Sequence, residues 1–257
     1  MKFHHFCFPL RKIFAVNLII EQGNTLTKVA VYEDGCMLSS SMHKQLDTVF
    51  LDSLFKIYPL KRGIMSTVID TDEEMVAYLR SRLERFIILD ETVSLPIEIG
   101  YETPSTLGKD RLAAVMGAYD QRPGQDILII DAGTAITYEL LESSGKYLGG
   151  NISPGMTTRF RALHQFTKKL PLLSEDEEIP FIGTSTEKAI QAGVVNGIVY
   201  EMDGYIDALK VKYSDLFVFL TGGHSFYFER RLKNSIFVDI NLVFGGLNRI
   251  LEYNVEN

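Results

Sequence analysis

Two short segments of the sequence combine an acidic residue, a glycine and threonines directly after an apolar run. In the first segment Glu21 precedes Gly23, and in the second Asp131 precedes Gly133. Glycine lets the backbone approach a ligand closely, and the successive amides of a tight turn suit a phosphate group. The acidic side chain beside each turn supplies the negative charge of a cation site. The chemistry indicated is phosphate binding next to a cation.

Each segment alone is equally explained as an ordinary hairpin whose polar side chains serve only the turn. The order of parts is nevertheless the same in both: an apolar strand, an acidic residue, one intervening residue, a glycine and an alternating strand. Gly23 and Gly133 stand 110 residues apart, which fits two halves of a duplicated α/β architecture. The repeat therefore favours a nucleotide cleft over two unrelated turns.

A further candidate lies where a loop meets a helix. Residues 101–108 have loop composition, and small apolar residues at helical spacing follow from Asp110 onward. One interpretation is that Asp110 caps the helix and Arg111 forms a surface ion pair. The other is that Asp110 is a base for proton abstraction and that Arg111 binds a carboxylate through two hydrogen bonds. Both residues follow closely after Gly108. These residues alone leave both interpretations open.

The elements that must position these groups alternate between strand and helix, which is typical of an α/β fold. The first hairpin continues through an Asp34-Gly35 turn into another strand. Small residues over 189–198 permit close helix contact, either inside the fold or across a dimer, and Arg159 is expected on a solvated helix face. Periodicity predicts helices over 46–58, 72–85, 110–118, 156–164, 186–209 and 242–251, and strands over 63–68, 86–89 and 217–220.

The composition indicates an ordinary soluble globular protein, with 46% hydrophobic and 23% charged residues in a chain of 257. The net charge of −7 argues against nucleic acid and against an anionic membrane surface as partners. No run of about 18 apolar residues occurs, so no membrane span is expected. Cys7 and Cys36 lack metal-ligand spacing, and we expect a reducing, cytoplasmic setting.

Residues 1–15 need separate treatment, because they lack the apolar core and the cleavage site of a signal peptide. The first strand begins at Val16 or Asn17, and proteins with such a hairpin often begin a residue or two before it. We expect residues 1–15 to be a mis-called start, with Val16 encoded by a GTG initiator codon. A genuine short extension is the alternative.

Four segments in register resemble the type III pantothenate kinase family, and their order and spacing match it from Val16 to the end of the chain. This resemblance implies the acetate and sugar kinase, Hsc70 and actin superfamily: α/β, with duplicated ribonuclease H-like (actin-like ATPase) domains over 16–120 and 121–257 and an ATP cleft between them. It implies ATP-dependent phosphorylation of pantothenate to 4′-phosphopantothenate, the first step of coenzyme A biosynthesis. The segments are Glu21-Gln22-Gly23-Asn24-Thr25, Tyr101 to Arg111, Asp131-Ala132-Gly133-Thr134-Ala135 and Gly149-Gly150-Asn151-Ile152-Ser153-Pro154-Gly155.

The resemblance also implies roles for single residues. Asp110 matches the proton acceptor, and Asp131 matches the ligand of a monovalent cation, potassium or ammonium, while Mg²⁺ accompanies the phosphates. The turn at 221–224 matches one that borders the adenosine pocket in the superfamily. ATP would be bound by Glu21, Gln22, Gly23, Asn24, Thr25, Leu26, Thr27, Lys28 and Thr134. Pantothenate would be bound by Tyr101, Gly108, Lys109, Asp110, Arg111 and, across a homodimer, Thr186.

One departure from the family pattern concerns Glu21, because relatives usually carry Asp there to help organise Mg²⁺. Glutamate keeps the charge but adds a methylene, and Mg²⁺ tolerates little misplacement of its ligands; an intervening water would absorb the difference. Two alternatives follow, a kinase of another small alcohol such as a sugar, and a non-catalytic regulatory or accessory relative. Tyr101 and the run Gly108-Lys109-Asp110-Arg111 argue against the first alternative, and retention of Asp110, Arg111, Asp131 and Thr134 argues against the second.

Overall fold

The computed structural model of the chain describes residues 15–23 and 25–256. Two expectations fall outside these ranges: the extension, apart from residue 15, and the phosphate contact of Asn24. The first strand begins at Val16, as expected. Across the described ranges, every helix is too short or too polar to cross a membrane.

The first hairpin opens a five-stranded sheet with the order β3-β2-β1-β4-β5. In it β1 pairs antiparallel with β2 and parallel with β4. The turn between β2 and β3 holds Asp34 and Gly35 at φ 50° and 71°, the left-handed pair typical of a two-residue hairpin turn. The strands are β1 (Val16–Gln22), β2 (Thr27–Glu33), β3 (Cys36–His43), β4 (Leu60–Thr67) and β5 (Arg85–Ile88).

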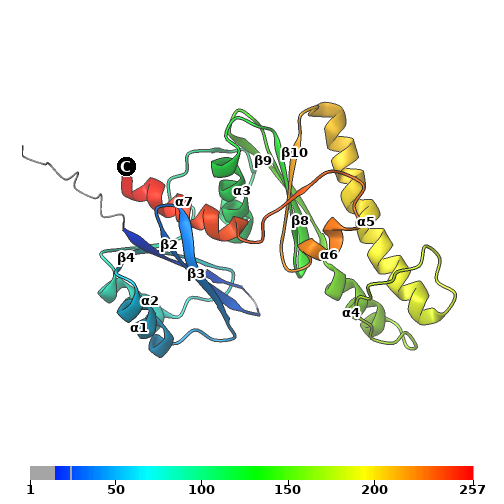
Figure 1. Cartoon of the computed structure of the whole chain (residues 1–257), viewed down its shortest axis with the longest axis horizontal. Coiled ribbons are helices and arrows are strands. Elements are labelled where there is room, and N and C mark those ends of the chain that lie inside the picture. The colour runs from blue at the N-terminus through cyan, green and yellow to red at the C-terminus, as the bar shows by residue number, and fades with distance from the viewer. Residues whose placement is uncertain (1–14, 24, 257) are drawn as a thin grey trace, which may run out of the picture.

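Two helices, α1 (Thr48–Ile57) and α2 (Glu73–Arg82), cover the outer face of this sheet (Figure 1). Each is preceded by an aspartate, Asp47 or Asp72, whose carboxylate accepts hydrogen bonds from backbone N–H groups of the first turn. Their apolar sides and alternate residues of β1, β2 and β4 form one core.

The second sheet repeats the first and has the order β11-β10-β7-β8-β9-β6. In it β7 pairs antiparallel with β8 and parallel with β10, as β1 pairs with β2 and β4. The repeat confirms the duplicated ribonuclease H-like fold. The strands are β6 (Glu98–Ile99), β7 (Ile127–Ala132), β8 (Ala135–Leu141), β9 (Lys146–Pro154), β10 (Phe217–Thr221) and β11 (Phe237–Val238).

Alternate residues of β7 face different helices. Ile127 and Ile129 pack with α3 and α7, and Leu128 and Ile130 pack with α4, α5 and α6 on the opposite face of the sheet. A short 3₁₀ turn precedes α3. These elements are η1 (Pro104–Thr106), α3 (Lys109–Gln121), α4 (Met156–Phe166), α5 (Thr186–Lys212), α6 (Ser225–Glu229) and α7 (Leu242–Glu256).

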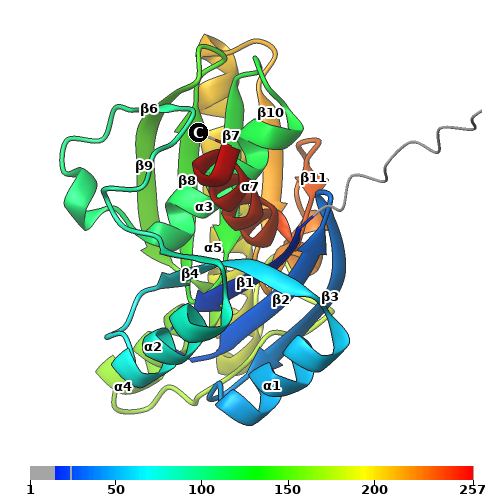
Figure 2. The same ribbon diagram turned by 90° about the vertical axis from the view of Figure 1, so that its left-hand side faces the viewer.

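The helices α3 and α7 lie between the two sheets and share a core with both of them (Figure 2). Gly117 of α3 and Gly246 of α7 leave no room for a Cβ against the facing backbone, so the two helices approach closely. The last helix of the chain therefore joins the two halves. The division between residues 120 and 121 stays a prediction, although β6, which precedes it, already pairs with β9 in the second sheet.

One expectation about the surface holds only in part. The side chain of Arg159 of α4 is 22% exposed, so it is partly solvated, but it also forms an ion pair with Glu201 of α5 at 2.5 Å. Its Nη2 also donates to the hydroxyl of Ser153 at 3.3 Å. The periodicity of α4 could not show this partner, which is supplied by a distant helix.

Candidate active site

The first hairpin places an acidic and a basic side chain opposite each other. Glu21 and Lys28 are direct partners in the β1–β2 pair, and Lys28 Nζ donates to the two carboxylate oxygens of Glu21 at 3.0 and 3.2 Å. Their side chains are 15% and 38% exposed. Lys28 is therefore held at the hairpin with its charge open to solvent. The other described residues that we expect to contact ATP here follow along the same hairpin: Gln22, Gly23, Thr25, Leu26 and Thr27.

In each hairpin the N–H of the glycine closes the turn, although the first turn is longer than the second. The N–H of Gly23 donates to the carbonyl of Leu26, and the N–H of Gly133 donates to that of Ala135, each at 3.0 Å. Thr134 is exposed, and its carbonyl accepts from the N–H of residue 155 at 3.0 Å and the hydroxyl of residue 158 at 2.7 Å. The second turn is thereby tied to the start of α4.

Four carboxylates from three parts of the fold share one electrostatic environment. Burial raises the pKa of Asp131 to about 7, and the negative charge of Glu21 is the next largest cause. Asp110 and Glu139 raise this pKa further, whereas Lys28 lowers it. Glu21 comes from the first sheet, Asp131 and Glu139 from the second, and Asp110 from α3 between them. The structure thus brings both hairpins and Asp110 together.

The surroundings of Asp131 suit a cation. Gly222, at φ 91° in the turn after β10, lies so close that a Cβ there would overlap Asp131 Oδ1. A bound cation would offset the repulsion between Asp131 and Glu21. Within residues 15–23 and 25–256, no three His, Cys, Asp or Glu side chains gather as metal ligands.

Asp110 lies in the first turn of α3 but does not cap it. The helix begins at Lys109, and Gly108 is its N-cap residue. Asp110 Oδ1 instead accepts a hydrogen bond from the N–H of Arg111 at 2.8 Å. A Cβ at Gly108 would lie 2.6 Å from the same oxygen, so the glycine is required by the position of the carboxylate. The interpretation of Asp110 as a helix cap is therefore wrong.

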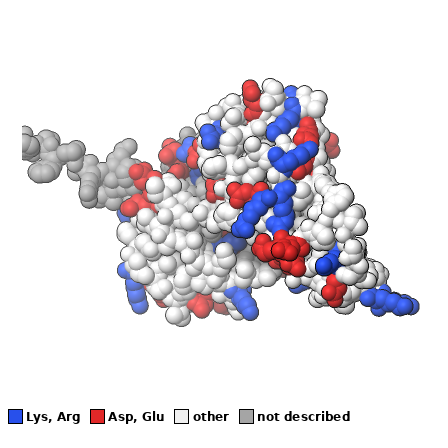
Figure 3. All heavy atoms as spheres, turned by 45° about the vertical axis from the view of Figure 1, so that its right-hand side comes forward, with Lys and Arg blue, Asp and Glu red and all other residues white. Residues whose placement is uncertain are grey.

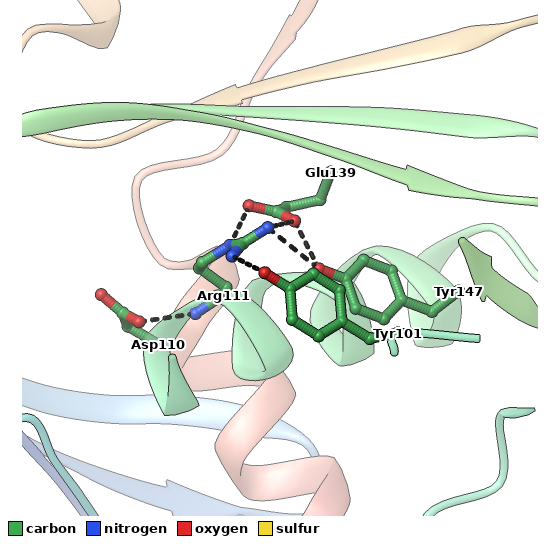
Figure 4. A network of polar contacts seen from close by, with 5 residues as sticks. All are labelled: Tyr101, Asp110, Arg111, Glu139 and Tyr147. Carbon is green, nitrogen blue, oxygen red and sulfur yellow. Dashed lines mark hydrogen bonds and ion pairs between the residues drawn. The ribbon is translucent and has the colours of Figure 1, made fainter. Parts of the chain in front are cut away.

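Arg111 is not part of a surface ion pair either. Its side chain is 7% exposed and that of Glu139 is fully buried. Arg111 Nε lies 2.6 Å from Glu139 Oε1, and Nη2 lies 2.8 Å from Oε2 (Figure 4), which is a bidentate pair. Burial alone would lower the pKa of Arg111, but the hydrogen bonds and charge of Glu139 raise it overall. The guanidinium therefore stays charged inside the protein.

Two tyrosines complete this network. The hydroxyl of Tyr147 donates to Glu139 Oε2 at 2.5 Å and accepts from Arg111 Nη2 at 3.3 Å. The ring of Tyr101 stacks on that of Tyr147, with centroids 6.3 Å apart. Arg111 Nη1 makes a long contact of 3.5 Å with the hydroxyl of Tyr101. The structure thus brings the expected residues Tyr101 and Arg111 together, and it adds Glu139 and Tyr147, which sequence reasoning missed.

Two other residues expected at the pantothenate site lie apart from this network. Lys109, beside Asp110 on α3, forms a long ion pair with Glu91 at 3.8 Å. Thr186 is the first residue of α5, which covers the face of the second sheet opposite to α3. One protomer therefore does not bring Thr186 to Asp110.

The two repeated sheets, each opened by a hairpin, define the fold of the actin-like superfamily. Solved structures share the fold. A ROK family glucokinase from Streptomyces griseus, crystallised with glucose and AMPPNP, matches with a TM-score of 0.52 at 10% identity, over 95% of this chain and 100% of that one. A Campylobacter jejuni protein provisionally described as a Baf family transcriptional activator matches with 0.59 at 21%, over 93% and 100%.

Sequence comparison identifies the family within this class. The family model for type III pantothenate kinase matches residues 17–208. A type III pantothenate kinase of Bacteroides fragilis (strain YCH46) is 50% identical over 239 residues, which cover 93% of this chain and 98% of the relative. The chain belongs to the type III pantothenate kinase family.

Proposed function

We propose that this protein transfers the γ-phosphoryl group of ATP to the primary hydroxyl of pantothenate, giving 4′-phosphopantothenate and ADP in the first step of coenzyme A synthesis. The observation that carries the proposal is the position of Asp110. It lies in the same electrostatic environment as Glu21 and Lys28 of one hairpin and Asp131 of the other. This is the arrangement that a proton acceptor beside two phosphate-binding turns requires.

In-line phosphoryl transfer depends on the placement of the reactants and on charge neutralisation. Each residue of the site can have a separate role in it. Asp110 accepts the proton of the attacking hydroxyl. Lys28 and the amides of the two turns offset charge on the phosphates. Arg111 and Tyr101 hold pantothenate by hydrogen bonds, with Arg111 supplying charge-assisted donors.

Bound cations would supply further charge neutralisation at the phosphates. Asp131 would hold potassium or ammonium, and Glu21 would act on Mg²⁺ through a water that takes up its extra methylene. The ion pair with Lys28 holds the Glu21 carboxylate along the hairpin. The cytoplasm is the setting that we propose from the cysteine usage.

A homodimer is proposed as well. Thr186 would reach the pantothenate site of the partner, because its own Asp110 lies across the sheet. Of the small residues expected to mediate contact, Ala192 is buried inside the fold, whereas Gly193 has open space around it. The side of the molecule seen in Figure 3 carries broad uncharged areas beside mixed charges, and exposed apolar side chains include Ile152, Phe166, Phe181, Ile182 and Tyr200.

The experiment is a coupled assay of ADP release with and without pantothenate. We expect release that depends on pantothenate and a product of the mass of 4′-phosphopantothenate. Release with a sugar in place of pantothenate would support the kinase of another alcohol. No release with any acceptor, from folded protein that binds ATP, would support the non-catalytic alternative.

A further inference from the structure

The bidentate pair with Glu139 determines which part of Arg111 can meet a ligand. Glu139 occupies Nε and Nη2 at 2.6 and 2.8 Å, so one edge of the guanidinium is fully used. The remaining nitrogen, Nη1, points toward the hydroxyl of Tyr101 at 3.5 Å (Figure 4). That distance leaves Nη1 with unused capacity to donate to another acceptor.

Glu139 is itself fixed from several sides. Its Oε2 accepts from the hydroxyl of Tyr147, and a Cβ at Gly150 would lie 2.5 Å from the same oxygen. The carboxylate therefore rests against the backbone of β9 and has little freedom to turn. Fold stability alone gives little reason for this arrangement, because a buried ion pair is often no more stabilising than apolar residues of similar volume.

We propose that Glu139 is a positioning residue for substrate binding: it holds the guanidinium of Arg111 so that Nη1 and the hydroxyl of Tyr101 together face the substrate. This inference rests on the proposed function, in which Arg111 and Tyr101 bind pantothenate. Tyr147 acts through Glu139, by fixing the carboxylate that in turn fixes Arg111.

Three roles for Glu139 predict different outcomes when its charge is removed. If it positions Arg111, the Glu139→Gln substitution raises the KM for pantothenate although the site becomes more positive. If it acts only through its charge, the same substitution lowers the KM, because an anionic substrate then meets an uncompensated guanidinium. If it serves the fold alone, the melting temperature and the active fraction fall while both KM values stay unchanged.

The experiment measures the KM for pantothenate and for ATP, kcat and the melting temperature of the full chain. For Glu139→Gln we expect the KM for pantothenate to rise about 10- to 100-fold, the effect of one charge-assisted hydrogen bond, and the KM for ATP to stay within about twofold. Asp52→Asn is the matched control: Asp52 also binds an arginine and a tyrosine, Arg82 and Tyr78, but on the outer helices α1 and α2.

A second variant keeps the inference testable if Glu139→Gln does not fold. Tyr147→Phe keeps the ion pair and removes only the hydroxyl, and we expect a smaller rise in the KM for pantothenate, about three- to tenfold. An unchanged or lower KM for pantothenate in Glu139→Gln overturns the inference. If that variant does not fold, an unchanged KM in Tyr147→Phe overturns it.

Arg111→Gln separates this inference from the proposed function. If the wild-type protein phosphorylates pantothenate and Arg111→Gln raises the KM for pantothenate, a normal KM for pantothenate in Glu139→Gln overturns the positioning role alone. A wild-type protein inactive with pantothenate, or a normal KM in Arg111→Gln, overturns the proposed function or its assignment of Arg111, and with it this inference.

Discussion

The strand β8 carries two arginine–glutamate–tyrosine networks, one on each face. Neighbouring residues of a strand point to opposite faces, so Glu139 enters the network with Arg111 and Tyr147, and Tyr138 enters a second network. In the second network Glu201 accepts from Tyr138 at 2.7 Å and from Arg159 at 2.5 Å. The chemical groups are the same, but their surroundings differ.

The ion pair of the first network is buried and lies next to the carboxylates of the proposed active site, whereas the ion pair of the second network is partly exposed. The side chains of Arg111 and Glu139 are 7% and 0% exposed, and those of Arg159 and Glu201 are 22% and 24% exposed. Burial would raise the pKa of Glu201, but its hydrogen bonds and Arg159 lower it overall. The comparison indicates that position relative to Asp110 and the two turns, rather than the kind of interaction, distinguishes the network that we propose to bind substrate from the one that joins α4 to α5.

The largest effect is expected at Asp110, which precedes Arg111 of the first network. Asp110→Asn should lower kcat at least about a hundredfold, because an amide cannot accept the proton and general-base catalysis contributes on the order of 10²- to 10⁴-fold. Folding and ATP binding should be retained, since Asp110 does not cap α3. Asp120→Asn on the same helix, where Asp120 pairs with Arg249 at 3.3 Å, is the control and should keep normal turnover. Near-normal turnover of Asp110→Asn would remove the base assignment.

Removing one carboxylate from each network should lower the free energy of unfolding by different amounts. Glu139→Gln leaves a buried guanidinium without its partner and should lower the free energy of unfolding by about 3–5 kcal/mol. Glu201→Gln should cost only about 1 kcal/mol, because its pair is partly solvated. The double variant Arg111→Gln with Glu139→Gln should recover stability relative to Glu139→Gln, since no charge is left unpaired. Denaturant unfolding measures all three, and equal losses for the two single variants would contradict the comparison.

Asp131 should show the opposite effect, a gain of stability. Its pKa is raised from 3.8 to about 7 in the folded protein, so the folded state binds the proton more tightly than the unfolded state. Stability without a cation should therefore fall as pH rises from about 4 to 7. Asp131→Asn removes this dependence and should melt at a higher temperature than wild type at pH 8, although it loses activity.

Potassium should then affect the stability of the wild type and of Asp131→Asn differently. Added at constant ionic strength and pH 8, it should raise the melting temperature of the wild type and not that of Asp131→Asn, because only the carboxylate binds it. The same melting temperature for both proteins at pH 8 without potassium would show that Asp131 ionises there without cost.

Local sequence signals were enough to predict the hairpins and most helices. The turns at Gly23 and Gly133 and the helix predicted over 72–85 follow from spacing and residue type alone. The network partners could not be predicted in this way. Glu139 lies 28 residues from Arg111 and Glu201 lies 42 residues from Arg159. The packing of α3 on β8 brings the first pair together, and the packing of α4 on α5 brings the second pair together.

The spacing of residues also could not predict which charged side chains are buried. A basic residue in the first turn of a helix is usually solvated, and the small apolar residues that follow Arg111 gave no sign that it would be covered. The available signal was Glu139 itself, which is the one charged residue in the strand Ala135–Leu141. A buried acid requires a partner, although the sequence does not say which basic residue supplies it.

The smallest and most selective effects are expected from the two tyrosine hydroxyls. Tyr147→Phe and Tyr138→Phe each remove one hydroxyl that donates to a glutamate, at 2.5 and 2.7 Å respectively. Each should cost about 1 kcal/mol of unfolding free energy, the usual contribution of such a bond. Their kinetics should nevertheless differ, because only Tyr147 holds the carboxylate that orients Arg111. We expect the KM for pantothenate to rise in Tyr147→Phe and to stay normal in Tyr138→Phe, with the KM for ATP normal in both. Matched losses of stability with matched KM values would show that the two networks differ only in exposure.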